Sequence, residues 1–134
     1  MQRSFSRELN SLGVLFDFVD EAATRYRLRE DTWFAARLVS EEIFTNMVKY
    51  GGGEGTISMS VEVRDERLQI AFAHPGAIPF DVTEAGEVDI DQPIESRKPG
   101  GMGLYLVRRF MDEIAYEHAD GTARVTLTKH LGGS

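Results

Sequence analysis

The chain has 134 residues, no cysteine and a formal net charge of -7, with 15 lysines and arginines against 22 aspartates and glutamates. This length suits one domain with a buried core, and we interpret residues 1–134 as a single domain. The lack of cysteine excludes disulfides and thiolate metal sites. The acidic balance argues against binding to nucleic acid or to an anionic membrane. No signal peptide or membrane-spanning run is visible, so we expect a cytoplasmic protein.

The N-terminal residues predict a strand followed by a helix. We expect residues 3–9 to form a short strand, with Phe5 and Leu9 on one face. A helix should then begin at a cap formed by Asn10 or Ser11. Apolar residues at helical spacing predict its buried face, which consists of Leu12, Phe16, Val19, Ala23 and Tyr26.

A second helix is predicted from about Asp31 to Lys49. The glycines at 51–53 end it, because glycine is the common residue just beyond a helix C-terminus. Its apolar stripe consists of Phe34, Leu38, Val39, Ile43 and Met47. The large aromatic residues are most simply interpreted as core, namely Phe16, Phe18, Trp33, Phe34 and Phe72.

Two hairpins are predicted in the rest of the chain. Apolar and polar residues alternate strictly over residues 56–63, which is typical of a half-buried strand. The sequence RDER at 64–67 turns the chain into a partner strand carrying Leu68, Ile70 and Phe72. Near the C-terminus, EIAYEH and ARVTLTKHL indicate two strands joined by an Asp-Gly turn.

Residues 76–100 have no periodicity, and a loop of this length in a compact domain is often a lid or a binding loop. A third helix is predicted from about Leu104 to Met111. These elements predict an α+β fold in two layers, a mixed and mostly antiparallel sheet with helices covering one face.

Three glycines lie within the four residues GGMG at 100–103, just before the third helix. A helix N-terminus offers unpaired N–H groups and the positive end of the helix dipole. Glycine lets the backbone approach a ligand closely. The segment is therefore a candidate cradle for an anion, most often phosphate. A flexible link into the helix is the alternative explanation.

Glu42 and Asn46 are four residues apart, so they share one face of the second helix at the border of its apolar stripe. Burial of a carboxylate there raises its pKa and suits it to act as a general base. The amide oxygen of Asn46 suits Mg²⁺, which keeps most of its waters and takes few protein ligands. The alternative for this pair is a solvated polar edge of the helix.

These two segments also carry a family pattern. EEIFTNMVKYG at 41–51 resembles the N box of the GHKL (histidine-kinase-like) ATPase superfamily, and GGMGLYLVRRFMDEIAYE at 100–117 resembles its second glycine box. Within that superfamily the chain is most similar to the anti-sigma-factor serine kinases. The order and spacing of the motifs, together with the order of the elements, extend the resemblance over nearly the whole chain.

The resemblance implies the Bergerat, or histidine-kinase-like ATPase, fold, with ATP and Mg²⁺ as cofactors. Glu42 would be the general base, and Asn46 would be the metal ligand that holds Mg²⁺ on the ATP phosphates. The lid loop would cover the nucleotide. The other residues implied to contact the nucleotide are Lys49, Tyr50, Arg97, Lys98, Gly101, Met102, Gly103 and Leu104.

The first glycine box departs from the family pattern. There the family has an Asp two residues before a Gly, and this Asp accepts a hydrogen bond from the adenine amino group. Alignment of FAHPGAIPFDV on Gly76 puts His74 at that position, whereas alignment on PFD puts Pro75 there. A neutral histidine accepts one hydrogen bond. Loss of the carboxylate contact costs about 1–3 kcal/mol, or roughly tenfold to a hundredfold in affinity.

The resemblance implies a protein serine/threonine kinase that phosphorylates an anti-anti-sigma factor and silences a sigma factor, usually as a homodimer. One alternative is a partner-binding module on the same fold that has lost or weakened nucleotide binding. His74 favours this alternative, whereas the intact Glu42 and Asn46 oppose it. Another is a sensor-kinase ATPase domain cut from a larger protein, which the lack of a preceding dimerisation helix opposes. The acidic loop at 81–95 is interpreted as solvated or as facing a basic partner.

Overall fold

A computed structural model describes residues 1–52, 55–79 and 101–132. Its described strands form one sheet in the order β1-β2-β3-β5-β4, and every neighbouring pair is antiparallel. The elements are β1 (Gln2–Ser6), the 3₁₀ turn η1 (Leu9–Ser11), α1 (Leu12–Arg25), α2 (Glu30–Tyr50), β2 (Thr56–Arg64), β3 (Arg67–Pro75), α3 (Gly101–Phe110), β4 (Glu113–Ala119) and β5 (Thr122–His130).

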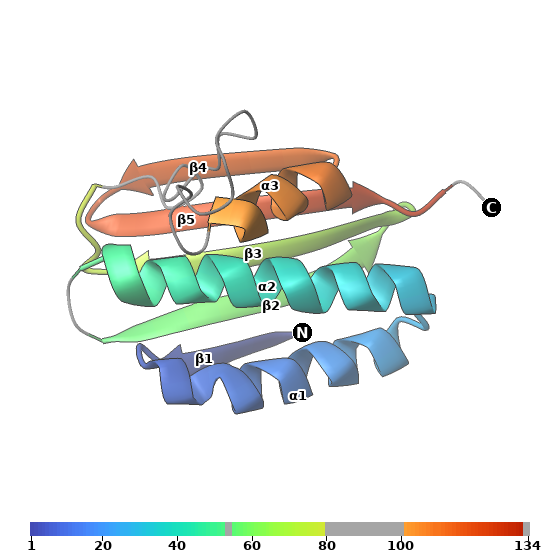
Figure 1. Cartoon of the computed structure of the whole chain (residues 1–134), viewed down its shortest axis with the longest axis horizontal. Coiled ribbons are helices and arrows are strands. Elements are labelled where there is room, and N and C mark those ends of the chain that lie inside the picture. The colour runs from blue at the N-terminus through green and yellow to red at the C-terminus, as the bar shows by residue number, and fades with distance from the viewer. Residues whose placement is uncertain (53–54, 80–100, 133–134) are drawn as a thin grey trace.

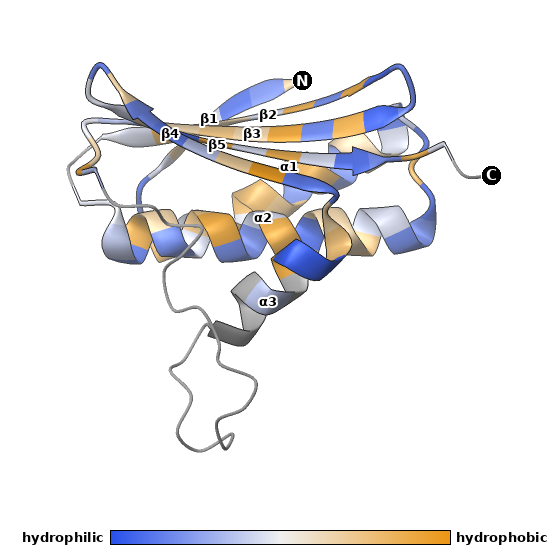
Figure 2. Cartoon of the chain, turned by 90° about the horizontal axis from the view of Figure 1, so that it is seen from above, coloured by the Kyte–Doolittle hydropathy of each residue, from blue (hydrophilic) through white to orange (hydrophobic). Residues whose placement is uncertain are grey.

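The three helices all lie on one face of the sheet, with α2 between α1 and α3 (Figure 1). Figure 2 shows the two layers from above, with the apolar side of α2 turned toward the sheet. The predicted α+β fold is therefore confirmed. The described strands are antiparallel throughout, whereas the sequence predicts a mixed sheet.

Both predicted hairpins are present, and both turn through two residues with positive φ. Asp65 and Glu66 have φ of 52° and 59°, and Asp120 and Gly121 have φ of 54° and 73°. Two-residue turns of this kind match the right-handed twist of the flanking strands. The strands alternate between the two faces of the sheet as predicted, because successive side chains of a strand point to opposite sides.

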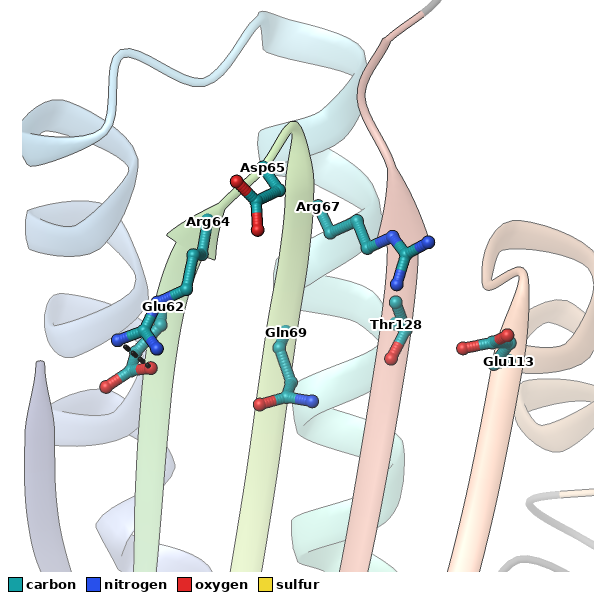
Figure 3. A pocket seen from close by; sticks show the side chains of 7 residues that line it. All are labelled: Glu62, Arg64, Asp65, Arg67, Gln69, Glu113 and Thr128. Carbon is teal, nitrogen blue, oxygen red and sulfur yellow. Dashed lines mark ion pairs between the residues drawn. The ribbon is translucent and has the colours of Figure 1, made fainter.

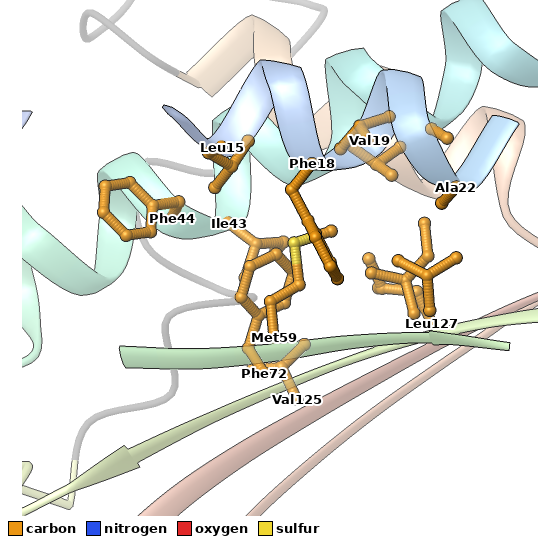
Figure 4. Packing of buried hydrophobic residues seen from close by; sticks show 14 of the residues in the cluster. Leu15, Phe18, Val19, Ala22, Ile43, Phe44, Met59, Phe72, Val125 and Leu127 are labelled. Carbon is orange, nitrogen blue, oxygen red and sulfur yellow. The ribbon is translucent and has the colours of Figure 1, made fainter. Parts of the chain in front are cut away.

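The core lies between the helices and the inner face of the sheet (Figure 4). Phe5 of β1 packs edge-on against Phe18 of α1 and Phe44 of α2, at ring-centroid distances of 6.0 and 6.1 Å. Edge-to-face packing is a favoured arrangement of aromatic rings. These contacts connect the N-terminal strand to both long helices.

The N-terminal prediction is wrong about the end of the strand, whereas its helix stripe is confirmed. Strand β1 ends at Ser6, and Leu9 begins the turn η1 with 46% of its surface exposed. Val19 and Ala23 of the predicted α1 stripe are buried, and Leu15 and Phe18 are buried beside them. The other predicted residues pack partly buried against the core, namely Leu12, Phe16 and Tyr26.

The predicted stripe of α2 is also partly wrong. Phe34 is 62% exposed and Trp33 is 37% exposed, so neither aromatic residue belongs to the core. Small residues such as Ala35 and Ala36 are buried instead. Val39, Ile43 and Met47 of the predicted stripe are fully buried, so this part of the prediction is confirmed.

No helix among the described residues is long and apolar enough to cross a membrane. Within the same residues, no group of three or more His, Asp or Glu side chains is arranged to hold a metal ion.

Candidate functional site

Helix α2 carries Glu42 and Asn46 one turn apart, at the border of its buried face. Asn46 is 4% exposed, and Glu42 is half-buried. The Oε1 atom of Glu42 is shielded from solvent and has no hydrogen-bond partner among the described residues. Burial raises the pKa of this carboxyl, the charge of Glu41 raises it further, and Lys49 acts in the opposite direction. A desolvated carboxylate without a partner is costly, and such groups concentrate at functional sites.

His74 lies at the end of β3, on the same face of the strand as the core residue Phe72. Its side chain is fully buried, and neither ring nitrogen has a hydrogen-bond partner among the described residues. Burial lowers the pKa of His74, and the positive charge of Arg7 lowers it further. The ring is therefore neutral at pH 7, with one nitrogen as donor and the other as acceptor.

The C-terminus of α2 packs directly against His74 because residue 51 is glycine. A β-carbon at this position would lie 2.6 Å from the carbonyl oxygen of Met47 and 2.9 Å from Nδ1 of His74. Gly51 has φ of -72°, a value open to any residue. Space, not backbone conformation, therefore requires glycine at position 51.

The chain after β3 is attached to the same end of α2. The backbone N–H of Ile78 donates to the carbonyl oxygen of Gly51 over 2.8 Å. Gly76 has φ of 79°, and its N–H donates to the carbonyl oxygen of Gly121 over 2.7 Å. The first residues of the predicted lid are thereby held between the end of α2 and the β4–β5 turn.

Arg7 belongs to this end of the molecule, and sequence reasoning missed it. Its Nη2 donates to the carbonyl oxygen of Val48 over 2.7 Å, a favourable place for a cation near a helix C-terminus. Its Nε is buried and has no hydrogen-bond partner among the described residues. A single arginine between a strand and a helix has no pattern that would identify it in the sequence.

Lys49 and Tyr50 are both exposed on the last turn of α2. Lys49 lies close enough to Glu42 to influence the pKa of its carboxyl. Along α2, the two residues lie between Glu42 and Gly51, the residue that packs against His74.

The glycine-rich segment lies in the first turn of α3, which begins at Gly101 and packs beside α2. The predicted start at Leu104 is therefore late by three residues. Tertiary packing overrides the low helix propensity of glycine here. The first-turn N–H groups of a helix have no partner within it, so the placement is compatible with an anion cradle. The predicted contacts of Arg97 and Lys98 lie outside the described residues, as does the loop from 80 onward.

The candidate site thus extends along the C-terminal half of α2, from Glu42 through Asn46 to Gly51. His74 of β3 packs against Gly51 at its end. Glu42 and Gly51 are nine positions apart, a rise of about 13 Å along a helix. Several enclosed polar atoms without partners are spread over this length.

A hollow lies at the end of the sheet opposite the α2 terminus, on the outer face beside the β2–β3 turn. It holds about 250 Å³, below the roughly 300–1,000 Å³ of typical ligand pockets. Figure 3 shows its side chains spread apart, with one ion pair between Arg64 and Glu62 at 3.8 Å. Acidic and basic groups are mixed along its wall, so no ligand charge is favoured. The lining consists of Glu62, Arg64, Asp65, Arg67, Gln69, Glu113 and Thr128.

Comparison with known families gives a match to the histidine kinase-like ATPase domain over residues 5–129. The chain is 28% identical over 116 residues to the serine/threonine-protein kinase BtrW of Bordetella bronchiseptica, covering 84% of this chain and 81% of that protein. It is 32% identical over 101 residues to the serine-protein kinase RsbW of Bacillus cereus, covering 71% of this chain. The match spans 62% of the length of RsbW.

Two solved structures share the fold. The catalytic domain of histidine kinase ThkA aligns with a TM-score of 0.54 and 17% identity, over 98% of this chain and 96% of that one. Histidine kinase AdeS of Acinetobacter baumannii aligns with a TM-score of 0.53 and 14% identity, over 99% of this chain and 68% of that one. At these identities the likeness supports the fold alone.

Proposed function

The chain belongs to the histidine kinase-like ATPase family, and on this premise we propose that it is an ATP- and Mg²⁺-dependent protein serine/threonine kinase. Its substrate is a serine-bearing anti-anti-sigma factor, and its regulatory target is a sigma factor, so it acts as an anti-sigma switch in transcription. Relatives whose names describe serine-protein kinases support the activity. The observation that carries the proposal is the enclosed carboxyl of Glu42, one turn before the buried Asn46.

Glu42 is the proposed general base. Its desolvated carboxyl holds a proton more tightly than an exposed one does, because burial raises the pKa. A base whose pKa approaches the working pH accepts the hydroxyl proton effectively in the transition state. Lys49 opposes that rise, because its positive charge favours the ionised form that acts as a base. Transfer would rest mainly on positioning and electrostatics.

The residues present fit a magnesium nucleotide. Asn46 is buried and supplies a neutral amide oxygen, which suits Mg²⁺ because this ion keeps most of its waters and takes few protein ligands. The N–H groups in the first turn of α3, from Gly101 to Leu104, suit phosphate oxygens. His74 of β3 packs against Gly51 at the end of α2, and its ring nitrogens have no hydrogen-bond partner among the described residues. The base of the nucleotide would lie on this side. When bound, ATP supplies the phosphoryl group and Mg²⁺ neutralises its charge.

The second candidate is a partner-binding module on the same fold, with nucleotide binding lost or weakened. The full burial of His74 favours it, because the ring packs against Gly51 and presents no surface to solvent. The Oε1 atom of Glu42 opposes it, because this atom is enclosed without a hydrogen-bond partner among the described residues, and a protein without catalysis has no reason to keep such a costly group.

Calorimetric titration of the protein with ATP, with and without Mg²⁺, separates the two candidates. A kinase should bind ATP more tightly when Mg²⁺ is present, with GTP as the control nucleotide. If neither nucleotide produces heat at millimolar concentration, the kinase proposal is wrong and sequestration by protein contact takes its place.

A further inference from the structure

Helix α2 has an apolar ridge on its solvent side, made of Phe34 and Leu38. Phe34 is 62% exposed, and Leu38 is partly exposed. The next residue in this row is Glu42, because positions four apart follow one ridge of a helix. Each step rises about 6 Å. The exposed apolar ridge therefore leads directly to the proposed base.

The ridge forms one wall of a hollow between α1 and α2, lined by Phe16, Phe34, Arg37, Leu38 and Glu41. The hollow holds about 140 Å³. That volume is below the roughly 300–1,000 Å³ of small-molecule pockets, so it suits side chains from another protein.

The polar groups beside the ridge are already held in place. The guanidinium of Arg37 stacks 4.6 Å from the ring centre of Phe16 and pairs with Asp20 at 3.8 Å. Asp20 also accepts a hydrogen bond from Nε1 of Trp33 over 2.7 Å. Phenylalanine, tryptophan and arginine are enriched at the energetic centres of protein interfaces. Side chains that are ordered before binding lose little entropy when a partner docks.

The surroundings of the hollow are acidic. Glu41 lines it, and Asp17 and Glu21 are exposed along the outer side of α1. Arg37, the cation in the lining, is already paired with Asp20. A partner surface should therefore carry lysine or arginine beside its apolar side chains. A second copy of this chain fits poorly, because a symmetric contact would place the same acidic side chains opposite each other.

We propose that Phe34 and Leu38 form the docking surface for the protein substrate, which lays a basic amphipathic helix along α2 and brings its hydroxyl toward Glu42. This inference rests on the proposed function and adds the recognition of the substrate to it. Aliphatic side chains of the partner helix would cover the ridge, and flanking lysines or arginines would meet Glu41 and the acidic side of α1. Helix-in-groove docking of this kind uses anchors spaced by three or four residues.

Trp33 makes the proposal measurable, because it is the only tryptophan of the chain and lies next to the ridge. The probe is a synthetic 18-residue helix with leucines at every third or fourth position and lysines flanking them. A second peptide has glutamates in place of the lysines. Titration followed by Trp33 emission should give a dissociation constant at least about tenfold lower for the lysine peptide, and added salt should weaken its binding.

Phe34→Ala tests the ridge itself. As a central apolar anchor it should weaken binding of the lysine peptide by about thirtyfold, the effect of losing about 2 kcal/mol at an interface hot spot. The matched control is Val14→Ala, which removes an apolar side chain of α1 that is 40% exposed and does not line the hollow. It should change the dissociation constant by less than about twofold.

Equal binding of the two peptides, or an unchanged dissociation constant in Phe34→Ala, would overturn the docking proposal. A dimer in sedimentation that Phe34→Ala dissociates would also overturn the proposal, because the ridge would then bind a second copy of this chain. A nitroxide on the peptide should broaden the amide signals of both Phe34 and Glu42, and broadening limited to α1 would also count against it. These titrations contain no nucleotide, so their failure leaves the kinase proposal standing, whereas absent ATP binding removes the kinase proposal and the substrate role together.

Discussion

The two ends of the molecule differ in how their polar groups are satisfied. At the end with the β2–β3 turn, Glu62 and Arg64 are exposed to water and form a long ion pair. At the other end, where α2 terminates, the ring of His74 and the Nε of Arg7 are enclosed, and neither has a hydrogen-bond partner among the residues that the structure describes. Exposed ion pairs contribute about 0–1 kcal/mol, whereas each unsatisfied buried group costs about 1–3 kcal/mol. The end that costs stability is therefore the better candidate for function.

The hollow beside the β2–β3 turn shows the same contrast. Side chains of both charges line it, so no ligand charge is favoured there. The α2 terminus is nearly closed by Gly51 and His74. The candidate site is therefore placed where polar atoms are enclosed, and not where a hollow is open.

The largest expected effect comes from Glu42→Ala, which removes the proposed base. Phosphoryl transfer should fall by about 10²–10⁴-fold, the usual contribution of general-base catalysis. Binding of Mg²⁺-ATP should change little, because the base acts after binding. Transfer is measured with radiolabelled ATP and the serine-bearing partner. Glu62→Ala, at the opposite end, is the control and should keep full activity, and full transfer in Glu42→Ala would remove the role of Glu42.

Asn46→Ala should weaken binding of Mg²⁺-ATP by about tenfold to a hundredfold, as expected for loss of one buried polar contact. Binding of ATP without Mg²⁺ should weaken less, because the amide is proposed to act through the metal. Calorimetry in the presence and absence of Mg²⁺ measures both values. An equal loss under the two conditions would assign Asn46 a structural role.

His74→Asp should tighten ATP binding by about tenfold to a hundredfold if His74 occupies the position that contacts the adenine amino group. The binding of GTP should not improve, because a carboxylate only accepts hydrogen bonds and guanine presents a carbonyl oxygen there. His130→Asp, an exposed histidine at the other end of the sheet, is the control. Unchanged ATP affinity in His74→Asp would contradict the alignment on Gly76.

Gly51→Ala should destabilise the fold by about 1–3 kcal/mol, the usual cost of an added methyl group in a packed site. The alanine methyl group has no space beside the carbonyl oxygen of Met47 and the ring of His74. Gly13→Ala is the matched control in α1. A β-carbon at Gly13 meets no atom within 4 Å, and alanine there should stabilise the helix by about 0.5–1 kcal/mol. Urea unfolding measures the stability of both variants. Equal unfolding midpoints for the two variants would show that residue 51 has room for a β-carbon.

The smallest effect concerns pH. The pKa of Glu42 is raised above its usual 4.5 by burial, so the folded protein holds this proton more tightly than the unfolded chain. The tighter binding of this proton increases the free energy of unfolding. The increase is fully present below pH 4.5 and is lost as the pH rises through the raised pKa. Glu42→Gln should therefore raise the melting temperature relative to wild type at neutral pH, and the difference should shrink toward pH 4. A gap that does not vary with pH would contradict the raised pKa.

Much of the fold is predictable from local patterns. The alternation of β2 and β3 and the Asp-Gly turn before β5 follow from strand and turn chemistry. The end of α2 follows from glycine at 51 and 52. The size and apolar character of Phe34 and Trp33 favour the core, but both are exposed. Hydrophobicity alone does not indicate which side of a helix faces the sheet.

The candidate site was only partly visible in the sequence. The spacing of Glu42 and Asn46 predicted a shared helix face, and the structure places both at the border of the buried side. The proximity of Arg7, Val48 and His74 was not predictable, because it joins three elements that are distant along the chain. The start of α3 at Gly101 was missed for a similar reason, since helix propensity places glycine outside the helix.

By itself, the sequence determined the order of the elements, the two hairpins and the chemical character of Glu42 and Asn46, because these depend on local periodicity and on residue type. The tertiary structure decided that His74 is buried and that residue 51 must lack a β-carbon. It also decided that Phe34 remains exposed on the ridge that leads to the proposed base. Burial and contact depend on how the helices rest on the sheet. That arrangement is a property of the packed layers and of no single segment.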